Sequence, residues 1–429
     1  MHDLFIKNGK VLDLKKKKWF DGSLVIEEGV IVEVGSANEI RSFKAGHDTI
    51  DASNSLVIPG LINSHTHLPE SLLRGICDDK ELKDWLWEEV WPREAKMGKN
   101  EAYAGALLGC LELIKNGCTS FIDQFYYADE IAKACKETGI RALICPSIFD
   151  RCPESGRIDN AMKKAISFVR KWKGKINVGF GPHAPYTVEK EYLIRIRELA
   201  IKYDVPIHIH ISETYEEIKN SMKKWRRTPT QYLDSIDFFD GKTIAAHCVF
   251  ANKKDIEILR KNKVNVVYLP TSNMKMGAGI APIVEYMKNG INVSIGTDGS
   301  ASNNNLSIIE EMMVGAIIQK GYNRNASLMN VWDVFSLATI NGAKAMGLEK
   351  KIGSLEVGKF GDVVLIDTKN SNFNPKNNLL SNLIYSATNE NVKTVIANGK
   401  IIMENRELIE LDEDKIIEMA NKAAESLAI

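Results

Sequence analysis

Two histidines separated by one residue stand in the stretch LINSHTHLPESL, residues 61–72. His65 and His67 follow an apolar run that is typical of a strand, in which residues i and i+2 point to the same face. Two imidazoles that face one cavity are characteristic ligands of zinc and related metal ions. The alternative is that each packs separately in the core, which is the usual role of a single buried histidine. The pair alone favours a metal site.

Most of the other histidines also follow apolar, strand-like runs. Six of the eight do so, and only His2 and His47 do not. The polar residues at or near the ends of these runs are His65, His67, His183, His208, His210, Glu213, His247 and Asp298. Random placement would scatter them over helices and loops as well, so the pattern predicts one shared site.

Three histidines and one carboxylate form a borderline nitrogen and oxygen ligand set, which suits zinc and also iron or manganese. His208 lies one layer deeper in its strand than His210, so we expect it to pack or to support a ligand. Asp298 could instead cap a helix or close a turn. Some barrels bridge two metals with a carboxylated lysine on the fourth strand, but GFGPHAP has no lysine and Lys175 lies at its other end. We therefore expect one divalent ion.

The composition is that of an ordinary globular protein. The 429 residues are 44% apolar, and 56 basic side chains balance 56 acidic ones, which gives no electrostatic reason for a nucleic-acid or membrane partner. We find no transmembrane stretch and no signal peptide. Seven cysteines without a Cys-x-x-Cys pair suggest reduced thiols. The expected location is the cytoplasm.

The elements that must position these residues alternate along the middle of the chain. Eight apolar runs are separated by helical patterns between residues 59 and 349. Strands that alternate with helices form parallel sheets, and eight such units predict a (β/α)8 TIM-like barrel, whose active sites lie at the C-terminal ends of the strands. The alternative is a doubly wound open sheet, but the glycine-rich phosphate loop of that fold is missing.

Both ends of the chain carry short strands of another kind. Asn8-Gly9 and Glu28-Gly29 are hairpin signals near the start, and a similar pattern with an Asn-Gly turn returns near the end. We expect an α/β protein in which residues 1–58 and 350–405 form a small β-sandwich domain. Residues 59–349 form the metal-dependent barrel, and residues 406–429 form a C-terminal helix.

Several motifs together resemble the amidohydrolase superfamily. They are PGLINSHTH, PHAPYTV, HIHISET, AHCV, LPTSNMKMGAG and GTDGSASNNNLS, in the order of that superfamily. Within it, the chain looks most like the methylthioadenosine/S-adenosylhomocysteine deaminase group, which includes archaeal 5′-deoxyadenosine deaminases. The resemblance implies a cytoplasmic homo-oligomer of S-adenosylmethionine salvage. It further implies one metal, with zinc first and iron or manganese as alternatives, and hydrolysis of the 6-amino group of an adenosine derivative to the inosine analogue and ammonia.

The resemblance also implies a role for each site residue. The metal ligands are His65, His67, His210 and Asp298. The proton-transfer residues are Glu213, which serves a purine ring nitrogen, and His247 with Asp298, which serve the water. The substrate contacts are Glu213, Asp298, His183, Glu94 at the ribose hydroxyls, and Arg157 with Arg151 at the 5′ side.

The chain departs from the group's pattern after RALIC, where Pro146 stands in place of an expected arginine. Arg151 is the candidate replacement. The departure favours 5′-deoxyadenosine, 5′-methylthioadenosine or adenosine over the carboxylate-bearing S-adenosylhomocysteine. One alternative is another amidohydrolase activity, either guanine or cytosine deamination or triazine dechlorination. A more distant one is a metal-binding scaffold without activity, which would not need the proton-transfer residues.

Overall fold

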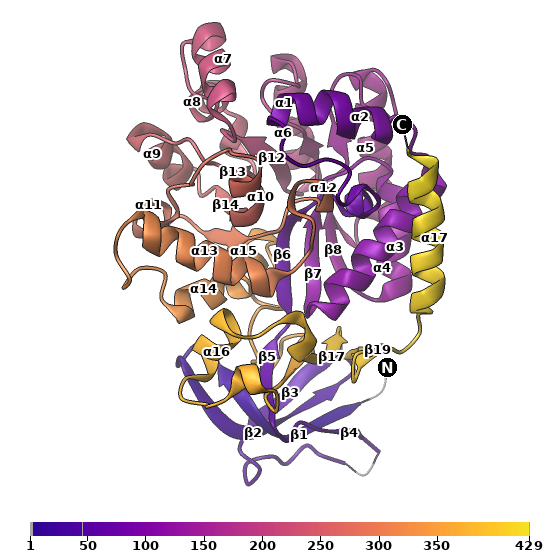
Figure 1. Cartoon of the computed structure of the whole chain (residues 1–429), viewed down its shortest axis with the longest axis vertical. Coiled ribbons are helices and arrows are strands. Elements are labelled where there is room, and N and C mark those ends of the chain that lie inside the picture. Colours follow the sequence, from indigo (N-terminus) through magenta and orange to yellow (C-terminus); the bar gives the residue numbers. More distant parts are fainter. Residues whose placement is uncertain (1–2, 45, 429) are drawn as a thin grey trace.

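The computed structural model describes residues 3–44 and 46–428, so His2 lies outside the described part of the chain. The fold is mixed α/β. Figure 1 shows a sheet at the lower end of the molecule, built from both ends of the chain, and a larger body of strands and helices above it.

One nine-stranded sheet contains the strands of both termini. Its order is β19-β18-β17-β16-β5-β1-β2-β3, with β4 paired to β1. The N-terminal strands are β1 (Leu4–Asp13), β2 (Lys18–Glu27), β3 (Val30–Gly35), β4 (Asp48–Asp51) and β5 (Ser55–Pro59). The C-terminal strands are β16 (Val363–Asp367), β17 (Val392–Ala397), β18 (Lys400–Glu404) and β19 (Glu407–Leu408). All are hydrogen-bonded into one sheet, so the expected sandwich of two sheets is not confirmed.

Two of the predicted turns form, and one does not. Glu28-Gly29 has positive φ at both residues and joins β2 to β3, and an Asn-Gly turn joins β17 to β18. The prediction of a turn at Asn8-Gly9 was wrong, because both residues lie inside β1, at an irregularity in its pairing with β2. A Cβ on Gly9 would lie 2.3 Å from Val57 Cγ2, so the glycine allows a close approach of β1 to β5.

The chain passes from this sheet to the upper body at Pro59 and Gly60. Strand β5 ends at Pro59, and β6 (Leu61–Thr66) begins two residues later, with Gly60 between them. A Cβ on Gly60 would lie 2.0 Å from Thr119 Oγ1, which explains the glycine at this point. The buried ion pair between Arg141 and Asp362 fastens the same junction, because it joins the start of β8 to the residue before β16.

All eight predicted runs form strands in the upper body. They are β6, β7 (Cys118–Asp123), β8 (Arg141–Ile144) with β9 (Ser147–Ile148), β10 (Asn177–Val178) with β11 (Gly181–Pro182), β12 (Ile207–Ile211), β13 (Thr243–His247), β14 (Asn265–Tyr268) and β15 (Val293–Ile295). The third run is interrupted at Pro146, which has no N–H to donate to a neighbouring strand.

The parallel strands pair in three groups, β10-β8-β7-β6, β11-β9 and β12-β13-β14-β15. Further hydrogen bonds link these groups. His208 N donates to Phe180 O at 2.9 Å, and Asp298 N, just past β15, donates to His65 O on β6 at 3.0 Å. The groups thus follow one another in chain order, with the C-terminal ends of the strands on one side.

Helices separate the strands and cover them. The longer ones are α3 (Lys99–Lys115), α4 (Ala128–Thr138), α5 (Ile158–Trp172), α6 (Lys190–Tyr203), α7 (Tyr215–Trp225), α9 (Lys253–Lys261) and α13 (Ile308–Tyr322). The C-terminal helix α17 (Glu413–Ser426) packs along α3 (Figure 1), and Lys115 bonds to Glu413 there. Among the described residues, no helix is both long and apolar enough to cross a membrane.

Candidate active site

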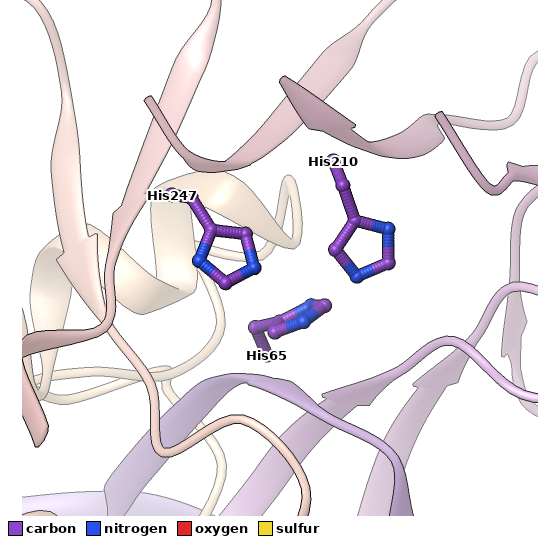
Figure 2. Close-up of side chains that lie close together, drawn as sticks. All are labelled: His65, His210 and His247. Atoms are coloured by element: carbon purple, nitrogen blue, oxygen red, sulfur yellow. The ribbon is translucent and has the colours of Figure 1, made fainter. Parts of the chain in front are cut away.

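The histidines at the strand ends lie together in space. Ligand atoms of His65, His67 and Asp298 all lie within 4.8 Å of one another, and so do those of His65, His210 and His247. Figure 2 shows the imidazoles of the second group converging from three strands. The two groups share His65, and Nε2 of His210 lies 3.3 Å from Nε2 of His67. One ion could therefore be reached from β6, β12 and the end of β15.

Backbone carbonyls orient two of these rings. Nδ1 of His67 lies 2.6 Å from the carbonyl oxygen of Gln124, and Nδ1 of His210 lies 2.7 Å from that of His183. A carbonyl oxygen can only accept, so each Nδ1 must carry the proton. In a neutral ring the Nε2 atom then has a free lone pair. Both Nε2 atoms are therefore available to a metal.

Asp298 presents Oδ1 to the cluster and accepts supporting hydrogen bonds at both oxygens, since Gly299 N donates to Oδ1 at 2.9 Å. Its Oδ1 atom lies 3.4 Å from His65 Nε2 and 3.3 Å from His67 Nε2. Its Oδ2 atom accepts from the hydroxyls of Ser272 at 2.6 Å and Ser302 at 2.9 Å. These two bonds fix the carboxylate so that Oδ1 faces the histidines.

Burial and mutual proximity shift the pKa values of this cluster. Burial lowers the pKa of His65 to about 4. Burial also acts to lower the pKa of His67, but the Glu70 and Asp298 carboxylates outweigh it and raise that pKa to about 10. A metal that binds Nε2 of His67 must therefore displace a proton from it. Burial would raise the pKa of Asp298, yet His65 and His67 hold it well below its usual range. The carboxylate is therefore charged at neutral pH, as a metal ligand must be.

The donor set fits a divalent ion such as zinc. Neutral imidazole nitrogens and a carboxylate oxygen are its usual ligands. His65 Nε2 is buried and has no hydrogen-bond partner among the described residues, although a buried polar atom normally has one. An ion bound between His65, His67, His210 and Asp298 would supply that partner.

Glu213 faces the cavity beside His247. Its Oε2 atom lies 3.8 Å from His247 Nε2, and burial raises its pKa above the usual range. The residue lies before α7, whose first-turn acid Glu217 accepts hydrogen bonds from the backbone N–H groups of Ser212 and Glu213. Glu217 therefore accepts the hydrogen bonds of the local backbone, and the Glu213 carboxyl faces the cavity.

His247 is positioned by its backbone and by an amide. It has a φ of 69°, in the left-handed region, which turns the ring inward at the end of β13. Its Nδ1 atom donates a hydrogen bond to Oδ1 of Asn273 at 2.9 Å, so the ring proton stays on Nδ1 and Nε2 has a lone pair. His247 can thus act as a base toward the cavity, where Glu213 can act as an acid.

A cavity opens over the cluster, and its wall contains both expected and unexpected residues. His183 and Glu94 line it, as do Trp85 and Trp91. Burial raises the pKa of Glu94 to about 7. Glu94 ends a short helix, α2 (Trp91–Glu94), that directly follows a π-helical turn, η2 (Trp85–Val90). Turns of this kind are frequent at functional sites.

Sequence reasoning missed several lining residues, of which Glu70 is the most polar. Its side chain is only 7% exposed, and burial raises its pKa well above the usual range. It stands three residues after His67 in the otherwise uncharged segment LPESLL, and that isolated acid is the signal that could have identified it. The other missed lining residues include Gln124, Phe125, Tyr126, Phe149 and Tyr186.

The two predicted arginines lie elsewhere. Arg151 and Arg157 are exposed and line a separate cavity next to Asp150, Glu189 and Tyr192. Neither belongs to the wall of the cavity over the histidines. Arg157 directly precedes α5, and its side chain acts electrostatically on Tyr192.

Comparisons with known proteins agree with this geometry. A sequence model of the amidohydrolase family matches residues 56–402. A 5′-deoxyadenosine deaminase of Methanobrevibacter smithii is 42% identical over 99% of this chain and 98% of its own. A 5-methylthioadenosine/S-adenosylhomocysteine deaminase of Thermoanaerobacter pseudethanolicus is 42% identical over 99% of both chains. Among solved structures, an adenosine deaminase from Xanthomonas campestris with bound zinc has a TM-score of 0.96 and 32% identity, and the match covers 99% of this chain and 98% of that one.

Proposed function

The chain belongs to the amidohydrolase family, and from this premise we propose that it is a metal-dependent deaminase of an adenosine derivative. It replaces the 6-amino group with oxygen, and the products are the inosine analogue and ammonia. The convergence of His65, His67, His210 and Asp298 at the strand ends, with Glu213 and His247 beside them, is the observation that carries this proposal. A scaffold without activity would not need the last two residues.

One zinc ion is the proposed cofactor, with iron or manganese as alternatives, and its ligands are His65, His67, His210 and Asp298. When bound, such an ion supplies Lewis acidity that makes water a nucleophile near neutral pH. His247 Nε2, with its free lone pair, takes a proton from the attacking water, and Asp298 assists. Glu213 delivers a proton to the ring nitrogen next to C6. The new C–O bond forms at C6, His247 passes the proton it took from water to the amino group, and the C–N bond breaks as ammonia leaves. The proton of the remaining C6 hydroxyl returns to the Glu213 carboxylate, so the C6 oxygen becomes a carbonyl.

Glu94 and His183 are the proposed substrate contacts, with Glu94 at the ribose hydroxyls. The composition of the cavity wall also indicates which 5′ substituent the substrate carries. In the part of the chain that the structure describes, the wall contains four acids (Glu70, Glu94, Glu213 and Asp298) but no lysine or arginine. Its apolar members include Leu82, Leu86, Val90, Trp91 and Phe149. Such a wall favours 5′-deoxyadenosine or 5′-methylthioadenosine over S-adenosylhomocysteine, because its four acids would repel a substrate carboxylate. Contacts from Arg151 or Arg157 would require their loop to move toward the cavity.

The proposed organisation keeps the three parts expected from the sequence. Residues 1–58 with 350–405 form the terminal domain, residues 59–349 a closed eight-stranded barrel, and residues 406–429 a C-terminal segment whose helix is α17. The hydrogen bond from Asp298 N to His65 O supports closure, because it joins the last strand to the first. We also propose a cytoplasmic homo-oligomer. The seven cysteines, all free, support the cytoplasmic location.

A substrate panel tests the proposal. The purified chain, loaded with zinc, should release ammonia from 5′-deoxyadenosine, 5′-methylthioadenosine or adenosine. A chelator should stop turnover, and added zinc should restore it. If adenosine derivatives are not turned over but guanine, cytosine or a chlorotriazine is, the proposed function is wrong and one of the alternatives is right.

A further inference from the structure

His208 lies directly behind His65, on the side away from the cavity. Both rings are fully buried, and Nδ1 of His65 lies 2.6 Å from Nε2 of His208. The other nitrogen of His208, Nδ1, lies 3.2 Å from the carbonyl oxygen of Ile244 on β13. His208 does not line the cavity, so it cannot reach a substrate there. The three groups form a line of hydrogen bonds that runs from β13 through β12 to β6.

The direction of these hydrogen bonds follows from their last member. The Ile244 carbonyl has no proton, so His208 Nδ1 must donate to it. In a neutral imidazole only one nitrogen carries a proton, so Nε2 of His208 is an acceptor. His65 Nδ1 must then donate to it, which leaves the lone pair of His65 on Nε2. This is the nitrogen that faces Asp298 Oδ1 at 3.4 Å.

The opposite direction is incompatible with metal binding through this atom. If His208 Nε2 carried the proton, His65 Nδ1 would have to accept it, and the proton of a neutral His65 would move to Nε2. A protonated nitrogen has no lone pair for a metal. His67 and His210 avoid this ambiguity because their Nδ1 atoms bond directly to backbone carbonyls. The described residues offer His65 Nδ1 no such carbonyl, and its partner is the side chain of His208.

We propose that His208 is a positioning residue that passes the polarity of the Ile244 carbonyl to His65 and so directs Nε2 of His65 toward the metal. The inference rests on the proposed metal-dependent function and adds a residue to it. Partners of this kind typically change metal affinity by about 10–100-fold when they are removed. The neighbouring ligand His210 keeps its own carbonyl partner, so the effect of removing His208 should be confined to His65.

Two substitutions at this position separate polarity from packing. In His208→Gln the amide oxygen can accept from His65 while the amide NH₂ group donates to Ile244, so the direction is kept. His208→Leu fills the space with neither group. His47→Leu is the control for loss of a buried histidine far from the site, since His47 lies beside Glu27 in the terminal domain.

Zinc affinity, measured by chelator competition on the full chain, is the main readout. We expect His208→Leu to bind zinc about 10–100-fold more weakly than the wild type, and His208→Gln and His47→Leu to bind within a few-fold of it. The absorption spectrum of the cobalt-loaded chain should change only in His208→Leu. Wild-type affinity in His208→Leu would overturn the inference, and so would a His208→Gln variant as weak as His208→Leu.

A measurement on the wild-type chain covers the case in which His208→Leu does not fold. Long-range ¹⁵N–¹H spectra of the zinc-loaded, ¹⁵N-histidine-labelled protein report the tautomer of each ring. We expect both His65 and His208 to carry the proton on Nδ1. A proton on Nε2 of His208 would refute the inference even if the chain binds zinc and deaminates adenosine derivatives. A chain that binds no divalent ion would refute the proposed function as well.

Discussion

The contact between β15 and β6 can be tested by adding one methyl group at Gly296. A Cβ on Gly296 would lie 2.6 Å from His65 N and 3.0 Å from His65 O, well inside the 3.4 Å at which ordinary contact begins. Both atoms belong to the backbone, so no side chain can rotate away. The strand that carries His65 and the loop that carries Asp298 must therefore separate in Gly296→Ala. The hydrogen bond from Asp298 N to His65 O spans this same contact.

The cost of such overpacking is typically about 1–3 kcal/mol, and a clash with backbone belongs at the upper end of that range. The ligand distances of a metal site tolerate shifts of only about 0.2 Å. If the strain is relieved by moving His65 away from Asp298, zinc binding must bring the two residues back together. The strain energy then appears as weaker zinc binding. A change of about 1–3 kcal/mol in binding corresponds to about 5–150-fold in affinity. We expect weaker zinc binding by a factor in this range and a matching loss of turnover at limiting zinc.

Chelator competition measures the zinc affinity, and urea unfolding of the metal-free chain measures the strain directly. Gly361→Ala is the control, because its Cβ would lie 2.8 Å from Ile26 Cδ1 in the terminal sheet, far from the histidines. It should lower the free energy of unfolding without changing the zinc affinity. The reasoning fails if Gly296→Ala is destabilised as expected but binds zinc as tightly as the wild type. In that case β15 and β6 could separate without disturbing the site.

Three further predictions concern the acids and the arginines. Glu213→Gln should lower kcat by about 10²–10⁴-fold and leave zinc content and KM nearly unchanged, since glutamine keeps the shape but has no proton to deliver; loss of zinc would instead indicate a structural role. Arg151→Ala and Arg157→Ala should leave kcat/KM for 5′-deoxyadenosine within about twofold of the wild type, because neither lines the cavity; a large loss in either would place its loop at the substrate. Burial raises the pKa of Glu311 from 4.5 to about 8, so its contribution to stability is complete below pH 4.5 and is lost as the pH rises to about 8. Glu311→Gln cannot ionise and should flatten the fall in unfolding free energy between pH 5 and 8 in urea titrations, whereas parallel curves for variant and wild type would contradict the shift.

The strand-end histidines could be predicted because a strand places residues i and i+2 on one face. The sequence His65-Thr66-His67 at the end of an apolar run therefore puts both imidazoles on the same side. The same reasoning placed His208 deeper than His210, and the structure has it behind His65. The acceptors that orient the rings could not be predicted, since the carbonyl of Gln124 lies 57 residues from His67 and any residue type supplies one. The position of Glu70 in the cavity wall could not be predicted, because a single acid belongs to no periodic pattern that would show which way it points. Asn8-Gly9 has the usual residues of a tight turn, but no turn forms there. Gly9 is needed because a side chain at this position would collide with Val57 on β5.

The residues just past the strands show why a motif alone is not enough. Ser212, His247, Cys248 and Asp298 all have φ between 47° and 69°, a region that residues other than glycine seldom occupy. Each such residue costs of order 1–3 kcal/mol unless its surroundings hold it. Two hydrogen bonds keep these residues in place, one from Cys248 N to Ile211 O and one from Asp298 N to His65 O, and both join neighbouring strands. The inward direction of His247 and Asp298 is therefore imposed by the assembled sheet. A chain with the same motifs but without the contact at Gly296 would carry the same ligands and would not aim them at one point.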